Sequence, residues 1–259
     1  MSAKKQLGQH FLADENLLGV IGRLSELGSD DVVLEVGPGL GVLTGYLAER
    51  ARLVHAVELD RSLEQHLAER LEGRPNVRLR FGDALSLDLA ALEPAPTKLV
   101  SNLPYNIATP FVVESFESLP SVELWCVMVQ REVADRFFAV PSTKAYGAVS
   151  VLVQLAAERT GFHPVSRTVF RPRPNVDSAL VAFRRRPADD SWERPRVKRI
   201  VEAAFAHRRK RLANSLELAG VAERGHAAAA LEEIGRDPGV RAEELEPQEF
   251  PALARALAE

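Results

Sequence analysis

The segment Asp31-Val32-Val33-Leu34-Glu35-Val36-Gly37-Pro38-Gly39-Leu40-Gly41 decides the fold. Its first six residues are mainly apolar and typical of a buried strand, and its glycines predict a tight turn before a helix over 42–50. Strand and helix patterns then alternate, with strands at 53–57, 77–81, 98–100 and 122–129 and helices at 61–71 and 110–116. This alternation predicts an α/β fold built on a parallel, doubly wound sheet.

The pattern changes in the last third of the chain. Residues 146–186 are more strand-like, and 179–183 read as a closing strand. After Pro187 the periodicity is helical throughout, and the segment 187–191 has lost it. We therefore expect a catalytic domain at 1–186 and a small all-helical domain at 187–259.

The bulk composition is that of an ordinary globular protein, with 259 residues, 46% hydrophobic and 27% charged. No apolar run approaches the length of a membrane span, and the N-terminus leads into mixed sequence, so we expect a cytoplasmic protein without a membrane partner. Cys126 is the sole cysteine and lies in an apolar run, which predicts a packed core residue. The six histidines are dispersed, so no metal site is expected.

Charge is unevenly distributed along the chain. The net charge is −3, yet residues 184–211 contain eleven Lys and Arg against four Asp and Glu, a local excess of +7. Such asymmetry indicates contact with nucleic acid. A solvated helix face would account for the charge run equally well.

A second informative segment, Asn102-Leu103-Pro104-Tyr105, follows the predicted strand at 98–100. Open α/β sheets bind ligands at the carboxyl ends of their strands. There the Asn102 amide oxygen and a backbone carbonyl could accept hydrogens from a planar amine while Tyr105 stacks on its ring. Taken alone, these residues fit a simple strand-to-helix turn equally well.

Acidic residues at other predicted strand ends point to a nucleotide-like cofactor. Glu58 comes twenty-one positions after Gly37 and suits a ribose diol. A dinucleotide fits poorly, because Val42 stands where its fingerprint needs a small residue. S-adenosylmethionine fits better, since it has no phosphate, its charge is positive, and Asp83 can accept from the adenine amine. The alternative is that Glu35, Glu58 and Asp83 are helix caps or surface charges.

These motifs resemble the ribosomal RNA adenine N6-dimethyltransferase family, in particular its KsgA/RsmA type, which acts on small-subunit rRNA. The matching segments span nearly the whole chain: 7–12, 34–41, 57–60, 82–84, 102–110, 130–134, 170–178 and 204–210. The resemblance implies a Rossmann-like class I methyltransferase sheet. It also implies a monomer that dimethylates two adjacent adenines in the 3′-terminal hairpin loop of 16S rRNA, in the assembling small ribosomal subunit.

The resemblance also assigns residues by matching position. S-adenosyl-L-methionine would be bound by His10, Leu12, Gly37, Gly39, Glu58, Asp83 and Asn102. The target adenine would be handled by the catalytic set Asn102, Leu103, Pro104, Tyr105 and Phe170. Phosphates would be bound by Arg167, Arg171, Arg173, Arg208, Arg209, Lys210 and Arg211.

One departure from the family pattern is His10, where the family normally has asparagine. The two X-Pro pairs beside Phe170, Arg171-Pro172 and Arg173-Pro174, predict that Phe170 lies in an exposed, rigid loop.

Two alternatives stay open. Macrolide-resistance methyltransferases, which act on 23S rRNA, share the Asn-x-Pro-Tyr and Phe-x-Pro-x-Pro pieces, although the segment 204–216 favours the small-subunit type. The chain could instead be a non-catalytic RNA-binding assembly factor on the same fold. The intact set of Glu58, Asp83, Asn102, Pro104 and Tyr105 speaks against that reading.

Overall fold

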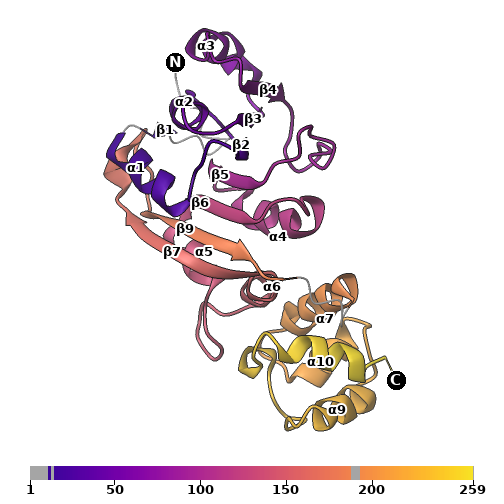
Figure 1. Cartoon of the computed structure of the whole chain (residues 1–259). Helices are drawn as coiled ribbons and strands as arrows, with labels where there is room; N and C mark the ends of the chain where they lie inside the picture. The colour runs from indigo at the N-terminus through magenta and orange to yellow at the C-terminus, as the bar shows by residue number, and fades with distance from the viewer. Residues whose placement is uncertain (1–10, 13–14, 188–192, 259) are drawn as a thin grey trace. The chain divides into compact units, whose positions relative to one another are not determined.

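The computed structural model describes residues 11–12, 15–187 and 193–258, and the chain divides into two compact units. The first unit contains the chain up to Ala134 together with Glu158–Arg185, and the second contains Asp135–Ala157 and the chain from Arg186 onward (Figure 1). The chain last passes from the first unit to the second between Arg185 and Arg186, whereas the sequence predicted the boundary after residue 186. The segment 135–157 was expected in the catalytic domain, but it groups with the C-terminal helices.

A seven-stranded sheet forms the centre of the first unit, in the order β4-β3-β2-β5-β6-β9-β7 (Figure 1). Its strands are β2 (Val32–Val36), β3 (Leu53–Glu58), β4 (Val77–Phe81), β5 (Lys98–Asn102), β6 (Leu124–Gln130), β7 (Ala157–Val165) and β9 (Ser178–Arg185). The pairings from β4 through β6 are parallel, as predicted, whereas β9 runs antiparallel to β6. The sheet is therefore mixed.

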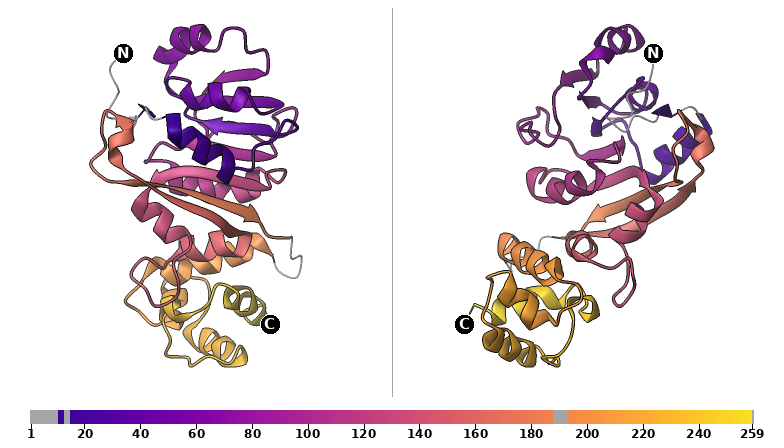
Figure 2. Two further views of the ribbon diagram at one scale, coloured as in Figure 1. Left: turned by 60° about the vertical axis from the view of Figure 1, so that its left-hand side comes forward. Right: turned by 180° about the vertical axis from the view of Figure 1, so that it is seen from behind.

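Helices cover both faces of this sheet. They are α1 (Glu15–Leu24), α2 (Val42–Ala48), the 3-10 turn η2 (Arg61–Leu63), α3 (Glu64–Arg70), α4 (Ala108–Ser118) and α5 (Arg131–Phe137), the last of which continues into the second unit. On one face, Ile21 of α1 and Leu47 of α2 pack against Val54 and Cys126. The left view of Figure 2 shows α1 lying across the sheet. On the other face, the ring of Phe116 in α4 lies 4.8 Å from that of Trp125.

A short ribbon joins the start of the described chain to a later loop. It consists of β1 (Phe11–Leu12) and β8 (Phe170–Arg171), which follows the 3-10 turn η3 (Arg167–Val169). The two strands pair antiparallel, with Leu12 opposite Phe170.

The second unit is helical, as predicted for the C-terminal part of the chain. Its elements are α6 (Ala148–Ala156), α7 (Arg194–Ala206), α8 (Leu212–Leu218), α9 (Arg224–Glu233), the 3-10 turn η4 (Ala242–Glu244) and α10 (Glu249–Ala256). They enclose a core that includes Tyr146, Ile200, Leu216 and Phe250. The Tyr146 hydroxyl donates to the carbonyl of Leu245 at 2.8 Å, so even the polar end of this buried ring is satisfied.

Helix α6 contradicts the strand-like reading of residues 148–156. The segment is rich in valine, which favours strands by its stiff χ1 angle. In the structure Val151 and Val153 are completely buried, and Val151 belongs to the core of the second unit. Burial of a helical face against that core therefore outweighs the local preference, which is worth only tenths of a kcal/mol per residue.

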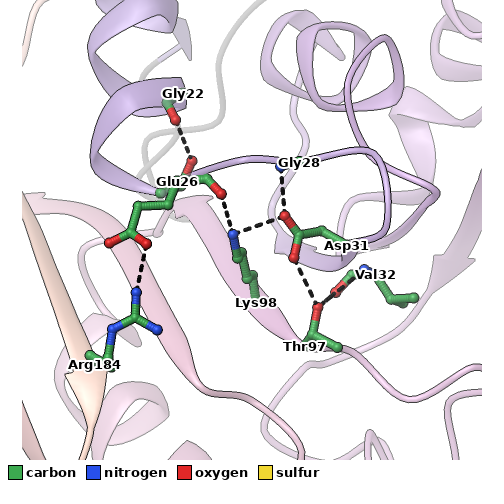
Figure 3. Close-up of polar contacts among 9 residues, drawn as sticks. Gly22, Glu26, Gly28, Asp31, Val32, Thr97, Lys98 and Arg184 are labelled. Atoms are coloured by element: carbon green, nitrogen blue, oxygen red, sulfur yellow. Dashed lines mark hydrogen bonds and ion pairs between the residues drawn. The ribbon is translucent and has the colours of Figure 1, made fainter.

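A polar cluster holds together the amino ends of β2 and β5 (Figure 3). The Lys98 ammonium lies 2.8 Å from an oxygen of Asp31 and also donates to the carbonyl of Glu26. The same Asp31 oxygen accepts from the N–H of Gly28 at 2.7 Å. The side chains of Lys98 and Asp31 are only 14% and 16% exposed, so water screens their attraction poorly.

Three further observations bear on the chemistry available. Cys126 is buried and its burial raises the thiol pKa to about 12, in agreement with a core role. Within the described ranges, no helix is long and apolar enough to cross a bilayer. The same residues contain no group of three or more His, Cys, Asp or Glu side chains that could hold a metal ion.

The cluster at the amino ends of the strands makes a stability prediction. We expect Lys98→Met to lower the free energy of unfolding by about 1–3 kcal/mol, because it leaves the Asp31 carboxylate poorly solvated and without its cation. The control is Arg184→Met. Its ion pair with Glu26 is shorter, at 2.6 Å, but more exposed, and should cost less than about 1 kcal/mol. Urea denaturation of both variants checks this, and equal losses would contradict it.

Candidate functional site

The site begins where β2 and β5 part. Their pairing includes Val33 with Lys98 and Leu34 with Leu99 and then stops, while each strand continues toward its carboxyl end. Strand order reverses here, since β3 and β4 extend to one side and β6 and β9 to the other. Beyond the last pair, the buried Ser101 hydroxyl donates to the Val36 carbonyl at 2.6 Å in place of a backbone bond. This topological switch point opens a crevice at the carboxyl ends of the strands.

The glycine turn after β2 forms one wall of the crevice. Gly37 has a φ of +76°, which favours glycine, and its N–H donates to the Val57 carbonyl at 2.8 Å. A Cβ on Gly37 would lie 3.2 Å from the Pro104 ring, so the absence of a side chain lets the turn approach the Asn102 segment closely. Gly39 and Gly41 also have positive φ values.

Glu58, the last residue of β3, ties this turn to its neighbours. One carboxylate oxygen accepts from the N–H of Gly39 at 3.1 Å, and the other accepts from the N–H of Asp60 at 2.9 Å. The side chain is 5% exposed, and burial raises its pKa. A carboxylate offers about four lone-pair sites, so Glu58 can still accept a hydrogen bond from a ligand hydroxyl.

The opposite wall is the segment that follows β5. The Leu103 N–H donates to the Met128 carbonyl at 3.1 Å, and the Pro104 carbonyl accepts from the N–H groups of Ile107 and Ala108, both at 3.1 Å. Leu103 is buried, whereas Asn102, Pro104 and Tyr105 are half-buried. The turn into α4 is therefore fixed by backbone hydrogen bonds at both ends.

Glu35 adds an unusual buried acid to the lining. It lies inside β2, is 1% exposed, and its Oε2 has no hydrogen-bond partner. Burial, together with the nearby charge of Glu58, raises the pKa of the Glu35 carboxyl to about 8. Because an unpaired buried carboxyl is stabilised by a cation, the lining fits a positively charged group.

Most of the sequence-predicted cofactor and catalytic residues meet in this one pocket. Its lining includes Gly37, Gly39, Glu58, Asp83, Asn102, Leu103, Pro104 and Tyr105. Asp83 is exposed at the end of β4, and its carboxylate accepts from the N–H of Leu85 at 2.9 Å. The acidic strand ends are thus neighbours in space, as predicted from the parallel sheet.

The other predicted members of that set lie elsewhere or are not described. The Phe170 ring is not exposed, contrary to the expectation for its loop. It is 2% exposed and packs in the core with Leu17 and Leu180, because β8 is held against β1. Phe170 does not line the pocket, and its contact with a base stays a prediction. Leu12 lies in β1, and His10 is outside the described residues.

The basic residues expected to bind RNA form two groups, one in each unit. In the first unit, Arg171 and Arg173 are exposed. Arg167 is also exposed, but its guanidinium donates to the Asn175 carbonyl at 3.1 Å and lies 3.9 Å from the Asp177 carboxylate. Arg167 therefore stabilises its own loop.

The second group lines a groove in the helical unit. Arg209, Lys210 and Arg211 meet Arg224 of α9 and Arg241 there. All five are exposed, and none of them is recorded in an ion pair with another residue of the described chain, although Glu244 also lines the groove. We call this set the basic groove.

Arg208 does not line the basic groove. Its guanidinium donates to the carbonyl of Tyr146 at 2.8 Å and lies 3.7 Å from the Glu243 carboxylate. Arg208 thus holds the loop before α6 against the C-terminal helices. Sequence reasoning treated the run 208–211 as uniform, and it missed Arg224 and Arg241, which come from separate elements.

Two further residues were also missed from the sequence, one in the pocket lining and one behind it. Glu35 had a signal, since it is a charged residue inside an apolar strand, but it was not placed among the cofactor residues. Ser178 had none: its Oγ lies 2.7 Å from the Tyr105 hydroxyl across 73 positions of sequence.

The open sheet and the crevice at its switch point define the class I methyltransferase architecture, as predicted from the sequence. A family model described as ribosomal RNA adenine dimethylase matches residues 1–258, and the chain belongs to this family.

Similar proteins agree with that assignment. The chain is 48% identical over 255 residues to the ribosomal RNA small subunit methyltransferase A of Rubrobacter xylanophilus, covering 98% of this chain and 95% of the relative. The crystal structure of the 23S rRNA methyltransferase ErmE is 31% identical, with a TM-score of 0.69 over 96% of this chain and all of that one. A dimethyladenosine transferase from Plasmodium falciparum shares the fold at 22% identity, with a TM-score of 0.80 over 94% and 96% of the two chains.

The buried Glu35 makes a pH-dependent prediction. Its ordinary pKa is 4.5, whereas the folded protein holds the proton up to about pH 8. Between these values the folded state binds more protons than the unfolded state, so Glu35 makes stability fall as pH rises from about 4.5 to 8. We expect Glu35→Gln to reduce this fall by on the order of 3 kcal/mol.

Urea denaturation of the protein without ligand, from pH 5 to pH 8, measures the effect. The matched control is Glu72→Gln, which removes an exposed carboxylate and should leave the pH profile parallel to wild type. A Glu35→Gln profile parallel to wild type would show that this carboxyl does not carry the proton.

Proposed function

We propose that this protein transfers methyl groups from S-adenosyl-L-methionine to the exocyclic amines of two adjacent adenines in the 3′-terminal hairpin loop of 16S rRNA. The observation that carries the proposal is that Asn102-Leu103-Pro104-Tyr105 and the acidic pair Glu58 and Asp83 line one pocket. A segment suited to a planar amine thus faces residues suited to a ribose and an adenine.

The cofactor supplies an electrophilic methyl group on a sulfonium centre. Glu58 would accept from the ribose hydroxyls while its existing bonds to Gly39 and Asp60 keep it in place. Asp83 would accept from the adenine amine. A bound cation would favour the ionised form of Glu35, whose buried Oε2 has no hydrogen-bond partner, and Gly37 and Gly39 would let the backbone approach the cofactor closely.

Recognition of the target amine needs two acceptors. One is the Asn102 amide oxygen. For the other, the sequence left Leu103 and Pro104 open, and backbone bonding favours Leu103. The Pro104 carbonyl already accepts two N–H groups, whereas among the described residues no donor is recorded for the Leu103 carbonyl. Two acceptors would draw the amine toward tetrahedral geometry, so that its lone pair points at the methyl group.

This mechanism relies on positioning and on electrostatic preorganisation rather than on a strong base. The adenine would be flipped out of its stack or presented from a loop, and Tyr105 would cover its face. Stacking on an aromatic side chain contributes roughly 1–3 kcal/mol per base. A contact from Phe170 would first require its ring to leave the core.

The proposed partner is 16S rRNA in the assembling small subunit. The basic groove and the exposed Arg171 and Arg173 would bind backbone phosphates, which fixes orientation without reading sequence. We further propose that the protein works as a monomer in the cytoplasm and needs no metal.

The choice between the two ribosomal subunits follows the relatives. The relative from Rubrobacter xylanophilus, named for the small subunit, is 48% identical, whereas the 23S rRNA methyltransferase ErmE is 31% identical. The less favoured alternatives are a macrolide-resistance-type activity on 23S rRNA and a non-catalytic role in ribosome assembly.

A single experiment tests the proposal. The protein is incubated with labelled S-adenosylmethionine and undermethylated small subunits, and nuclease digestion with mass spectrometry then locates the label. Dimethyladenosine at two adjacent positions near the 3′ end of 16S rRNA is expected. Label in 23S rRNA, with macrolide resistance in a sensitive host, would support the alternative instead.

Loss of the amide should separate catalysis from binding. We expect Asn102→Ala to lower methyl transfer by at least about 100-fold, as for other positioned catalytic groups, while RNA affinity changes little. Asn175→Ala, which removes an exposed amide outside the pocket, is the control. Single-turnover rates and filter binding measure the two effects, and full activity of Asn102→Ala would exclude the amide from orienting the amine.

The basic groove makes an independent prediction about salt. Each phosphate contact removed lowers the slope of log affinity against log salt by about 1. We expect the double variant Arg224→Glu/Arg241→Glu to weaken binding to small subunits and to flatten this slope. The control Arg199→Glu reverses one exposed arginine of α7 outside the groove, which is half the charge change of the double variant. If the double variant and its control shift the slope equally per reversed charge, the groove has no special part in binding.

A further inference from the structure

Tyr105 is held at both ends. Its backbone belongs to the turn between β5 and α4, which the two hydrogen bonds to the Pro104 carbonyl fix. Its hydroxyl lies 2.7 Å from the Oγ of Ser178, the first residue of β9. Burial raises the pKa of the Tyr105 phenol, so it keeps its proton and the hydrogen bond persists at neutral pH.

Ser178 is a rigid anchor. It is 1% exposed and lies opposite Gln130 where the β6–β9 ladder ends. The preceding residue, Asp177, accepts from the N–H of Arg131 at 3.0 Å through its carbonyl and from the N–H of Arg167 at 3.1 Å through its carboxylate. The hydroxyl of Ser178 therefore has a defined place, which its loop and its strand both determine.

The orientation of Tyr105 matters because its ring is the aromatic surface that the described pocket lining offers to a base. Of the described residues that line the pocket, Tyr105 is the one aromatic residue, and Phe170 is buried in the core. A tyrosine ring fixed only at Cβ can rotate about two side-chain bonds, whereas a hydrogen bond at its far end selects one orientation.

We propose that Ser178 is a positioning residue for methyl transfer: its hydroxyl holds the Tyr105 ring in the orientation that covers the acceptor adenine. This inference rests on the proposed function. Ser178 itself does not touch the base. It acts through Tyr105, and it links the segment that orients the amine to the start of the strand that closes the sheet.

Kinetics of the full-length protein test this role. We expect Ser178→Ala to lower kcat by about fivefold, the change that corresponds to the loss of one net hydrogen bond, with KM for the small subunit within twofold of wild type. Tyr105→Phe removes the same bond from the other side and should give the same loss. The double variant should lose no more than either single variant, since both remove one interaction.

A matched control separates positioning from stability. Ser115→Ala removes another buried serine hydroxyl of the first unit, which accepts from Trp125 and lies outside the pocket lining. It should lower Tm without changing kcat. Fluorescence of 2-aminopurine at the target position adds a direct readout: stacking quenches it, and both Ser178→Ala and Tyr105→Phe should partly restore it.

Unchanged kcat in Tyr105→Phe would overturn the proposal, even if Ser178→Ala failed to fold. Additive losses in the double variant would also overturn it. Failure of the proposed function would be distinguishable from failure of this positioning role, because the wild-type protein itself would then transfer no labelled methyl group to small subunits.

Discussion

The parting of β2 and β5 is the constraint on which the rest of the first unit depends. Pairing between them includes Leu34 with Leu99 and stops there, and one buried hydroxyl, that of Ser101, spans the start of the gap. Because all strands from β4 to β6 are parallel, every segment that carries chemistry leaves the sheet at the same edge. The glycine turn, Glu58, Asp83 and the Asn102 segment therefore face one pocket without any long-range device to gather them.

Within that pocket, backbone N–H groups restrain the side chains that carry charge. Glu58 accepts from Gly39 and Asp60, and Asp83 accepts from Leu85. Such bonds orient a carboxylate before a ligand arrives, which lowers the entropy lost on binding. Glu35 is the exception, because its Oε2 is buried without a partner. The pocket thus combines two preorganised acceptors with one unsatisfied acid, an arrangement that favours a cation over a neutral ligand.

The basic residues are arranged differently from these restrained carboxylates. The arginines of the basic groove do not converge on a buried point but line an exposed surface, where water can hydrate them. This suits contact with a phosphate backbone, whose charges are spread along a surface. Arg208 shows that sequence proximity is a poor guide to such a role. It adjoins Arg209 in the chain, yet backbone carbonyls and Glu243 engage it.

The sequence by itself determined the order of strands and helices from Val32 to Val129, because hydrophobic periodicity and turn residues are local signals. It also placed Glu58, Asp83 and Asn102 together, because the carboxyl ends of parallel strands share one edge of the sheet. Tertiary structure decided what depends on contacts between distant residues. Valine-rich 148–156 became a helix because a core formed against it, Phe170 turned inward because β8 is held against β1, and Ser178 reached Tyr105 because β9 closes the sheet beside β6. None of these outcomes has a local signature, since the free energy that selects each of them comes from burial and pairing with residues tens to more than a hundred positions away.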